Sequence, residues 1–136
     1  MSPLSSEVVS VLMAMERLRK QISRRGNVAF LITVGTDGRP HSVSVEVSWL
    51  DDELVMGAGN VSLANAKERP LVSLLWPTKQ SKSYSLIVNG TVTSATGTGT
   101  GDNRITVTPT RAVLHRSIEP ASVSAGDRSC ASVYSS

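Results

Sequence analysis

The sequence predicts a mainly β domain, an antiparallel sheet closed or half closed into a barrel, with flanking helices. Residues 27–49 hold two strand-like runs separated by Asp37-Gly38, a pair of residues typical of a hairpin turn. Six strand-like runs in all are joined mostly by short turns, and one long and one short helical pattern accompany them. A β-sandwich would use the same pattern, so these observations alone leave closure of the sheet open.

A helix is predicted over residues 5–25 because apolar residues recur there at three- and four-residue spacing. The recurring residues are Val8, Val11, Leu12, Met15, Leu18 and Ile22. Ser5 or Ser6 can cap the start of this helix, and its basic end is followed by Gly26. A helix that lies across a sheet is favoured over a membrane-binding or calmodulin-type helix.

The two strands of the predicted hairpin differ in pattern. Residues 28–34 form a nearly unbroken apolar run, as expected of a central strand covered on both faces. The second strand alternates, with Val43, Val45, Val47 and Trp49 on one face and Ser42, Ser44, Glu46 and Ser48 on the other. We therefore expect one face of the second strand to pack on the core and the other to be polar.

Four further strands and a short helix complete the predicted domain. The strands cover residues 54–56, 71–76, 84–95 and 104–114, and the helix covers residues 60–69. Asn60 is the expected cap of the short helix and Pro70 its stop. Residues 71–76 are apolar almost throughout and should be as buried as the first strand. Pro109 cannot donate to a ladder, so the last strand should lie at an edge or bend there.

Length and composition restrict the class of protein. A chain of 136 residues predicts one domain over residues 1–116, followed by a Ser-rich tail over residues 117–136. The net charge of +3 favours anionic ligands, but scattered charges and few aromatic residues argue against a nucleic-acid partner. Cys130 is the single cysteine, and charged residues interrupt the apolar pattern near the N-terminus. We therefore expect a cytoplasmic protein without a membrane segment.

Residues with evident chemistry are sparse. His41 and His115 are too few and too far apart in sequence to predict a metal site. Glu46 can serve as an acid or base, but a solvated or interface carboxylate is favoured because no second carboxylate is paired with it. No catalytic side chain is assigned.

One segment has a physical reason to bind an anion. A strand leads into Gly57-Ala58-Gly59-Asn60, and Ser62 follows in the first turn of the short helix. Free N–H groups at a helix N-terminus attract anions, and small residues let a phosphate approach the backbone. An ordinary capped turn explains the same pattern about as well.

Several features follow one another in a recognisable order over roughly residues 8–114. They are the leading helix, Asp37-Gly38-Arg39-Pro40-His41, the strand ending at Trp49, Asn65 five residues before Pro70, Val72-Ser73-Leu74, and Val88-Asn89-Gly90. This order resembles the pyridoxamine 5'-phosphate oxidase-like FMN-binding split-barrel family. The resemblance implies a six-stranded antiparallel split β-barrel with an N-terminal helix and a short helix between strands 3 and 4. It also implies a homodimer with FMN, or a deazaflavin in some branches, in the groove between subunits.

The resemblance also implies which residues meet the cofactor, because the phosphate in that family lies near the third strand and the following helix. Met56, Gly57, Ala58 and Gly59 would offer close-approach backbone, and Ser62, Asn65 and Lys67 would contact the phosphate or ribityl chain. Many members carry Lys or Arg where this chain has Ser62, and Pro where it has Ser44. A basic side chain would make a charge-assisted bond to phosphate, about twice as strong as a neutral one. The candidates to replace this charge are Lys67, Arg39, Lys79 and Lys82.

The function implied by the resemblance is that of an FMN-binding oxidoreductase that transfers hydride to or from an unidentified small molecule. One alternative is a carrier or sequestering protein for a deazaflavin or haem on the same fold. Another is a non-enzymatic barrel that binds protein. Ser62, in place of a basic residue, favours these alternatives. The vitamin B6 reaction itself is not expected, since the oxidase's substrate-binding arginines are not recognisable near the C-terminus.

Overall fold

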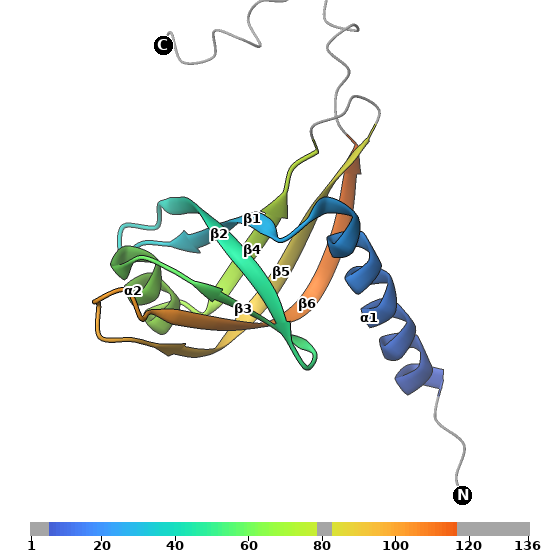
Figure 1. The fold of residues 1–136 in the computed structure, drawn as a ribbon, viewed down its shortest axis with the longest axis horizontal. Coiled ribbons are helices and arrows are strands. Elements are labelled where there is room, and N and C mark those ends of the chain that lie inside the picture. Colours follow the sequence, from blue (N-terminus) through green and yellow to red (C-terminus); the bar gives the residue numbers. More distant parts are fainter. Residues whose placement is uncertain (1–5, 79–82, 117–136) are drawn as a thin grey trace, which may run out of the picture.

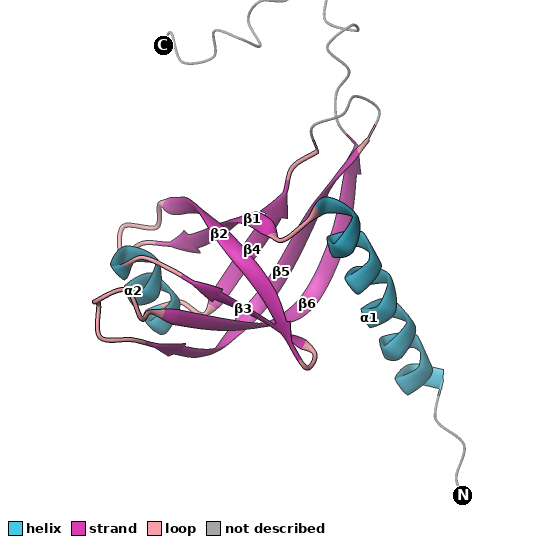
Figure 2. Ribbon diagram, viewed as in Figure 1, coloured by secondary structure: helices cyan, strands magenta, loops and turns pink. Residues whose placement is uncertain are grey.

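A computed structural model describes residues 6–78 and 83–116 of the chain, with side chains from Ala14 onward. The elements are α1 (Ser6–Arg25), β1 (Val28–Val34), β2 (Pro40–Leu50), β3 (Glu53–Gly57), α2 (Asn60–Glu68), β4 (Leu71–Trp76), β5 (Tyr84–Thr96) and β6 (Arg104–Arg116). Figures 1 and 2 show the mainly β fold with two helices that the sequence predicts. The predicted tail, Cys130, Lys79 and Lys82 lie outside the described residues. Neither described helix combines the length and apolar character needed to cross a bilayer.

The six strands close into an antiparallel barrel, which settles the choice between barrel and sandwich. Their order is β1-β2-β3-β6-β5-β4, with β4 pairing back to β1. The β1–β2 hairpin turns at Gly38, whose φ of +82° suits glycine, and the Gly38 amide donates to the Gly35 carbonyl at 2.9 Å. α2 lies at one end of the barrel, and α1 runs beside the far ends of β5 and β6 (Figure 1).

The core fills the barrel and extends under both helices. In β2, Val45 and Val47 are buried while Glu46 and Ser48 are exposed, so the predicted alternation is confirmed. Helix residues join the same cluster, namely Leu18 and Ile22 from α1 and Leu63 and Ala66 from α2. Each helix therefore attaches to the barrel through an apolar stripe.

The prediction that residues 28–34 and 71–76 are buried on both faces is wrong for the single chain. Leu31 and Leu74 are fully buried, but Phe30 is 42% exposed and Leu71 is 72% exposed. A barrel strand turns one face inward and one outward, and apolar residues on both faces do not reveal what covers the outer one. The outward residues of β1 and β4 form an apolar face, composed of Val28, Phe30, Ile32, Leu71 and Leu75.

The N-cap of α2 lies one residue earlier than predicted. Gly59 is the N-cap, and no side chain caps the helix, so the prediction that Asn60 is the cap is wrong. Asn60 is instead the first helical residue, and its Oδ1 accepts a hydrogen bond from Asn103 Nδ2 at 2.8 Å. This bond takes the Asn60 side chain away from its own helix and ties the β5–β6 loop to α2. The helix ends before Pro70, as predicted.

β6 has a paired and an unpaired portion along one of its edges. It pairs with β5 over its whole length, but its ladder with β3 runs only from Arg104 to Val107. Pro109, two residues after Val107, lies opposite Gly90 at a register shift, which confirms the predicted edge or bend. A Cβ on Gly90 would come within 2.4 Å of Val107 Cγ1, so this close crossing requires glycine.

Candidate functional site

A groove runs over the outer surface of the barrel where β2, β3 and β6 meet. Its volume is about 370 Å³, and it is lined by Glu46, Ser48, Val55, Met56, Gly57, Gly101, Asp102, Asn103 and Arg104. The β3–β6 ladder places Gly57 opposite Arg104. Two of the residues implied by the resemblance, Met56 and Gly57, therefore line a real groove, although Met56 itself is buried.

The connection from β3 to α2 leaves its backbone open. A Cβ on Gly57 would meet only the Asn103 carbonyl oxygen, at 3.7 Å, and one on Gly59 would meet nothing within 4 Å. The first intrahelical bond runs from Leu63 N to Gly59 O, at 3.0 Å, so the N–H groups before it have no acceptor within the helix. With the exposed Arg104 nearby, this segment combines donors, space and a positive charge, the requirements for an anion.

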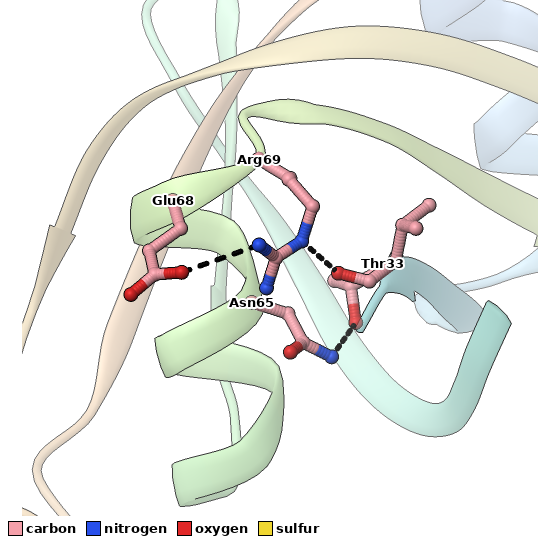
Figure 3. Close-up of polar contacts among 5 residues, drawn as sticks. Thr33, Asn65, Glu68 and Arg69 are labelled. Carbon is pink, nitrogen blue, oxygen red and sulfur yellow. Dashed lines mark hydrogen bonds and ion pairs between the residues drawn. The ribbon is translucent and has the colours of Figure 1, made fainter. Parts of the chain in front are cut away.

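Ser62 and Asn65 lie on the buried face of α2. Ser62 is only 1% exposed, and its buried Oγ has no hydrogen-bond partner. Asn65 Nδ2 donates to Thr33 Oγ1 of β1 at 3.1 Å, and both side chains are buried (Figure 3). Both residues therefore lie under the helix, apart from the groove lining.

The basic side chains near α2 have other tasks or lie away from the groove. Arg69 Nε donates to the Val34 carbonyl at 2.6 Å and its Nη1 pairs with Glu68 at 3.2 Å (Figure 3). Arg39 pairs with Asp37 in the β1–β2 turn at 3.5 Å. Lys67 is exposed in the last turn of α2, about 10 Å along the helix axis from its first residue. None of these side chains lines the groove.

Arg104 is the cation that the sequence analysis missed. It lies 47 positions after Gly57 in the chain, and only the pairing of the last strand with the third brings the two together. The signal that could have found it is barrel closure, which makes the first residue of β6 a neighbour of the last residue of β3.

The groove also holds two carboxylates, Glu46 and Asp102. Thr98 donates to Asp102 Oδ1 through its backbone N–H and its hydroxyl, each at 2.9 Å. These bonds, the backbone one first, lower the pKa of Asp102, so the carboxylate is charged at neutral pH. These two negative charges would repel an anion, whereas Gly57, Arg104 and the start of α2 offer space, a cation and N–H donors. Within residues 6–78 and 83–116, no three His, Cys, Asp or Glu side chains gather as a metal site would require.

Solved structures of other proteins share this fold. An FMN-binding protein from Syntrophomonas wolfei matches with TM-score 0.62 and 14% identity, over 83% of this chain and 95% of its own. A pyridoxinephosphate oxidase family protein from Clostridium acetobutylicum matches with TM-score 0.58 and 10% identity, over 76% and 93%. The chain thus has the split-barrel fold of the pyridoxamine 5'-phosphate oxidase-like proteins.

Proteins with this fold carry different groups. An F420 reductase matches with TM-score 0.55 and 19% identity, over 65% of this chain and 90% of its own. The haem storage protein HutZ from Vibrio cholerae matches with TM-score 0.55 and 13% identity, over 74% and 94%. At these identities the likeness concerns the fold alone.

The family is defined by sequence relatives, although no protein-family model matches the chain. The uncharacterized proteins Mb0449c of Mycobacterium bovis and MT0457 of Mycobacterium tuberculosis are each 37% identical to it over 112 residues. The alignments cover 71% of this chain and 76% of each relative. The chain belongs to the family of these two mycobacterial proteins.

Proposed function

We propose that the chain binds a flavin-type cofactor, FMN in the first instance, and works as an oxidoreductase on a small molecule. The observation that carries the proposal is the open backbone at Gly57 and Gly59 beside the exposed Arg104. The FMN-binding protein and the F420 reductase with the same fold support a flavin-type ligand. We also propose a cytoplasmic location, on the composition of the sequence.

The chain's own residues would bind and orient the cofactor. Arg104 and the free N–H groups of the first turn of α2 would hold the phosphate. Gly57 and Gly59 would let it approach the backbone, and Val55 and Ser48 would form the groove surface alongside. The isoalloxazine, when bound, supplies the hydride transfer. Glu46 and Asp102 would keep a second anion out of the groove.

We further propose that the protein is a homodimer that pairs through the apolar face of β1 and β4. Phe30, Ile32 and Leu71 lie on the outer surface of a single chain, where large apolar residues gain by being covered. A two-fold pairing would bury the same patch on both copies. Light scattering should give twice the chain mass, and Phe30→Glu should give the monomer. A monomer mass for the unaltered protein across micromolar dilution would contradict this.

FMN titration followed by flavin fluorescence tests the cofactor proposal. Arg104→Ala should weaken binding about tenfold or more, because it removes a charge-assisted hydrogen bond. Arg39→Ala, which removes a cation outside the groove, is the matched control and should leave the affinity within about twofold. Val61→Lys adds a cation at an exposed position of the first turn of α2 and should strengthen binding. Ser62→Lys would instead bury its charge and lose stability.

A carrier or sequestering protein is the second candidate function, and the buried Ser62 at the expected cation position favours it. The carried group would be a deazaflavin or haem, as the F420 and haem proteins of this fold suggest. A visible spectrum of protein purified without added cofactor distinguishes flavin, deazaflavin and haem. Oxidation of NADPH or NADH by the loaded protein separates an enzyme from a carrier. If no saturable binding of any of the three occurs, a protein-binding barrel takes the place of both proposals.

A further inference from the structure

A second groove lies at the other end of the barrel, between α1 and the far ends of β5 and β6. It consists of two adjoining cavities of about 350 and 600 Å³, both of which are bordered by Gln21 and Leu114. We call it the α1 groove. It is far from α2 (Figure 1), so it is separate from the proposed cofactor site.

The floor of the α1 groove is apolar in the smaller of its two cavities. Leu86 and Leu114 are partners in the β5–β6 ladder, and Ala112 lies two residues before Leu114 on the same face of β6. Leu18 closes the floor from the side of the helix. Leu114 is 44% exposed, so the floor offers uncovered apolar surface.

One flank of α1 lines this groove with cations. Arg17, Lys20 and Arg24 are spaced by three and four residues, which places them along one side of the helix. None of the three makes a hydrogen bond or ion pair within the described residues. No carboxylate lines either cavity. The groove is therefore positive along its length and apolar beneath in its smaller cavity.

On the other flank of α1, the cation Arg19 has partners within the chain. Arg19 donates to the Asp51 carbonyl, pairs with Asp52 at 3.1 Å, and lies over the ring of Trp49 at 4.1 Å from its centroid. Arg19 therefore helps to fix the helix on the β2–β3 turn. Arg17, Lys20 and Arg24 do not fix the helix in this way.

Arg25 lines the groove and links the end of α1 to the start of β5. Its Nη1 donates to Gln21 Oε1 at 2.7 Å, and its Nη2 donates to the Tyr84 carbonyl at 2.7 Å. Its acceptors are neutral oxygens, so its positive charge is not balanced by a carboxylate. Burial, and then the neighbouring Arg24, lower the pKa of Arg25, which nonetheless stays charged at neutral pH. Arg25 thus adds a fixed positive charge to the wall of the groove.

We propose that the α1 groove binds an acidic peptide segment of a partner protein, with an apolar side chain on the exposed Ala112 and Leu114. Arg17 and Arg24 are about 10 Å apart along the helix axis, a span that suits several carboxylates in succession. A single fatty-acid carboxylate would engage one end only. A nucleic acid fits poorly, because the floor is aliphatic and Tyr84 is the one aromatic residue among the groove's lining residues.

The test is fluorescence anisotropy with a fluorescein-labelled (Glu-Glu-Leu)₄ peptide at low salt. Arg17→Glu with Arg24→Glu should weaken binding about tenfold or more, since each change removes an attraction and adds a repulsion. Lys67→Glu with Arg39→Glu makes the same change of net charge at the α2 end and should alter the affinity by less than about twofold. Leu114→Ser should weaken binding several-fold, whereas Val61→Ser, at an exposed site on α2, should not.

Four results would overturn the proposal. Equal weakening by the two double variants would mean that only net charge matters. Equal affinity for (Glu-Glu-Ser)₄ would mean that the apolar floor is not used. Absence of saturable binding by the unaltered protein, or tighter binding of a dT₁₂ oligonucleotide, would exclude an acidic peptide as the occupant. Circular dichroism of each variant verifies that the fold persists. FMN titration of the two variants in the α1 groove, Arg17→Glu with Arg24→Glu and Leu114→Ser, should be unchanged, so this proposal can fail independently of the cofactor proposal.

Discussion

The two helices are attached to the barrel in different ways. α2 has nine residues, and four of them, Ser62, Leu63, Asn65 and Ala66, are buried against the barrel end. α1 has twenty residues, and among its side chains described from Ala14 onward Leu18 and Ile22 reach the core, with Met15 packed against it. Its first turns extend away from the barrel (Figure 1). α2 closes the fold, whereas α1 leaves one flank free for contacts outside the chain.

The polar side chains of the two helices differ in the same way. Two polar side chains at α2 reach the barrel: Asn65 of the helix donates to Thr33, and Arg69, its C-cap, donates to the Val34 carbonyl. Among the side chains of α1 described from Ala14 onward, the charged ones are exposed, apart from Arg19 and Arg25, which fasten the helix at two places. Two measurements of stability would sharpen or break this difference, and a third concerns carboxylates outside the helices; the three follow in order of expected size.

The largest effect should come from Leu18→Ala, which removes the apolar anchor of α1. Leu18 is buried in the main core, so the change should lower the free energy of unfolding by about 2–4 kcal/mol. Leu50→Ala, at an exposed position, is the control and should cost less than about 1 kcal/mol. Urea unfolding provides both values. If Leu18→Ala leaves global stability unchanged and only raises hydrogen exchange in α1, the helix is an appendage rather than part of the core.

A smaller effect should follow from Asn65→Ala, which leaves the buried Thr33 hydroxyl without its donor. The expected loss is about 1–3 kcal/mol, the cost of an unsatisfied buried polar group together with lost packing. Adding Thr33→Val removes the orphaned hydroxyl and should restore part of that loss. If the double variant loses more free energy of unfolding than the two single variants together, this pair does not hold α2 as described.

The smallest effect concerns acid stability. The hydroxyls of Thr93 and then Thr108 lower the pKa of Glu53 from its ordinary value of 4.5, and bonds from Thr98 lower that of Asp102 from 3.8. Both carboxyl groups bind a proton more readily in the unfolded chain than in the folded one. They therefore stabilise the fold at pH values above their ordinary pKa values, and this stabilisation is lost as the pH falls through their lower pKa values in the folded protein. Thr93→Val with Thr108→Val should make stability between pH 5 and 3 fall less steeply. An unchanged dependence of the free energy of unfolding on pH would contradict this prediction.

The sequence predicted the elements well because each strand run carried its own local signal. Asp37-Gly38 predicted the first hairpin, and Pro70 predicted the end of α2. Burial of the outer faces could not be predicted, because Phe30 and Leu71 look the same in sequence whether another strand, a helix or a second copy covers them. Asn60 was misassigned as a cap because its partner, Asn103, is 43 residues away and comes near only through the fold.

The candidate site was predicted in part. The Gly57 to Gly59 segment was chosen for its small residues, and the structure shows open space at both glycines. Arg104 was missed, since its place beside Gly57 depends on barrel closure. The roles suggested for Ser62, Asn65 and Lys67 remain predictions, and the burial of Ser62 and Asn65 means that any contact with a phosphate would require α2 to shift.

The unpaired part of β6 bears on how the protein avoids aggregation. Beyond Val107 this strand shows one edge without a partner strand among the described residues, and such edges invite pairing between molecules. Pro109 removes a donor at the start of that stretch, and Arg111 and Arg116 add charge along it. Replacement of these three residues by neutral strand formers would convert the edge into a template for sheet growth. The residues that bend and charge β6 thus act as a safeguard for solubility at high concentration.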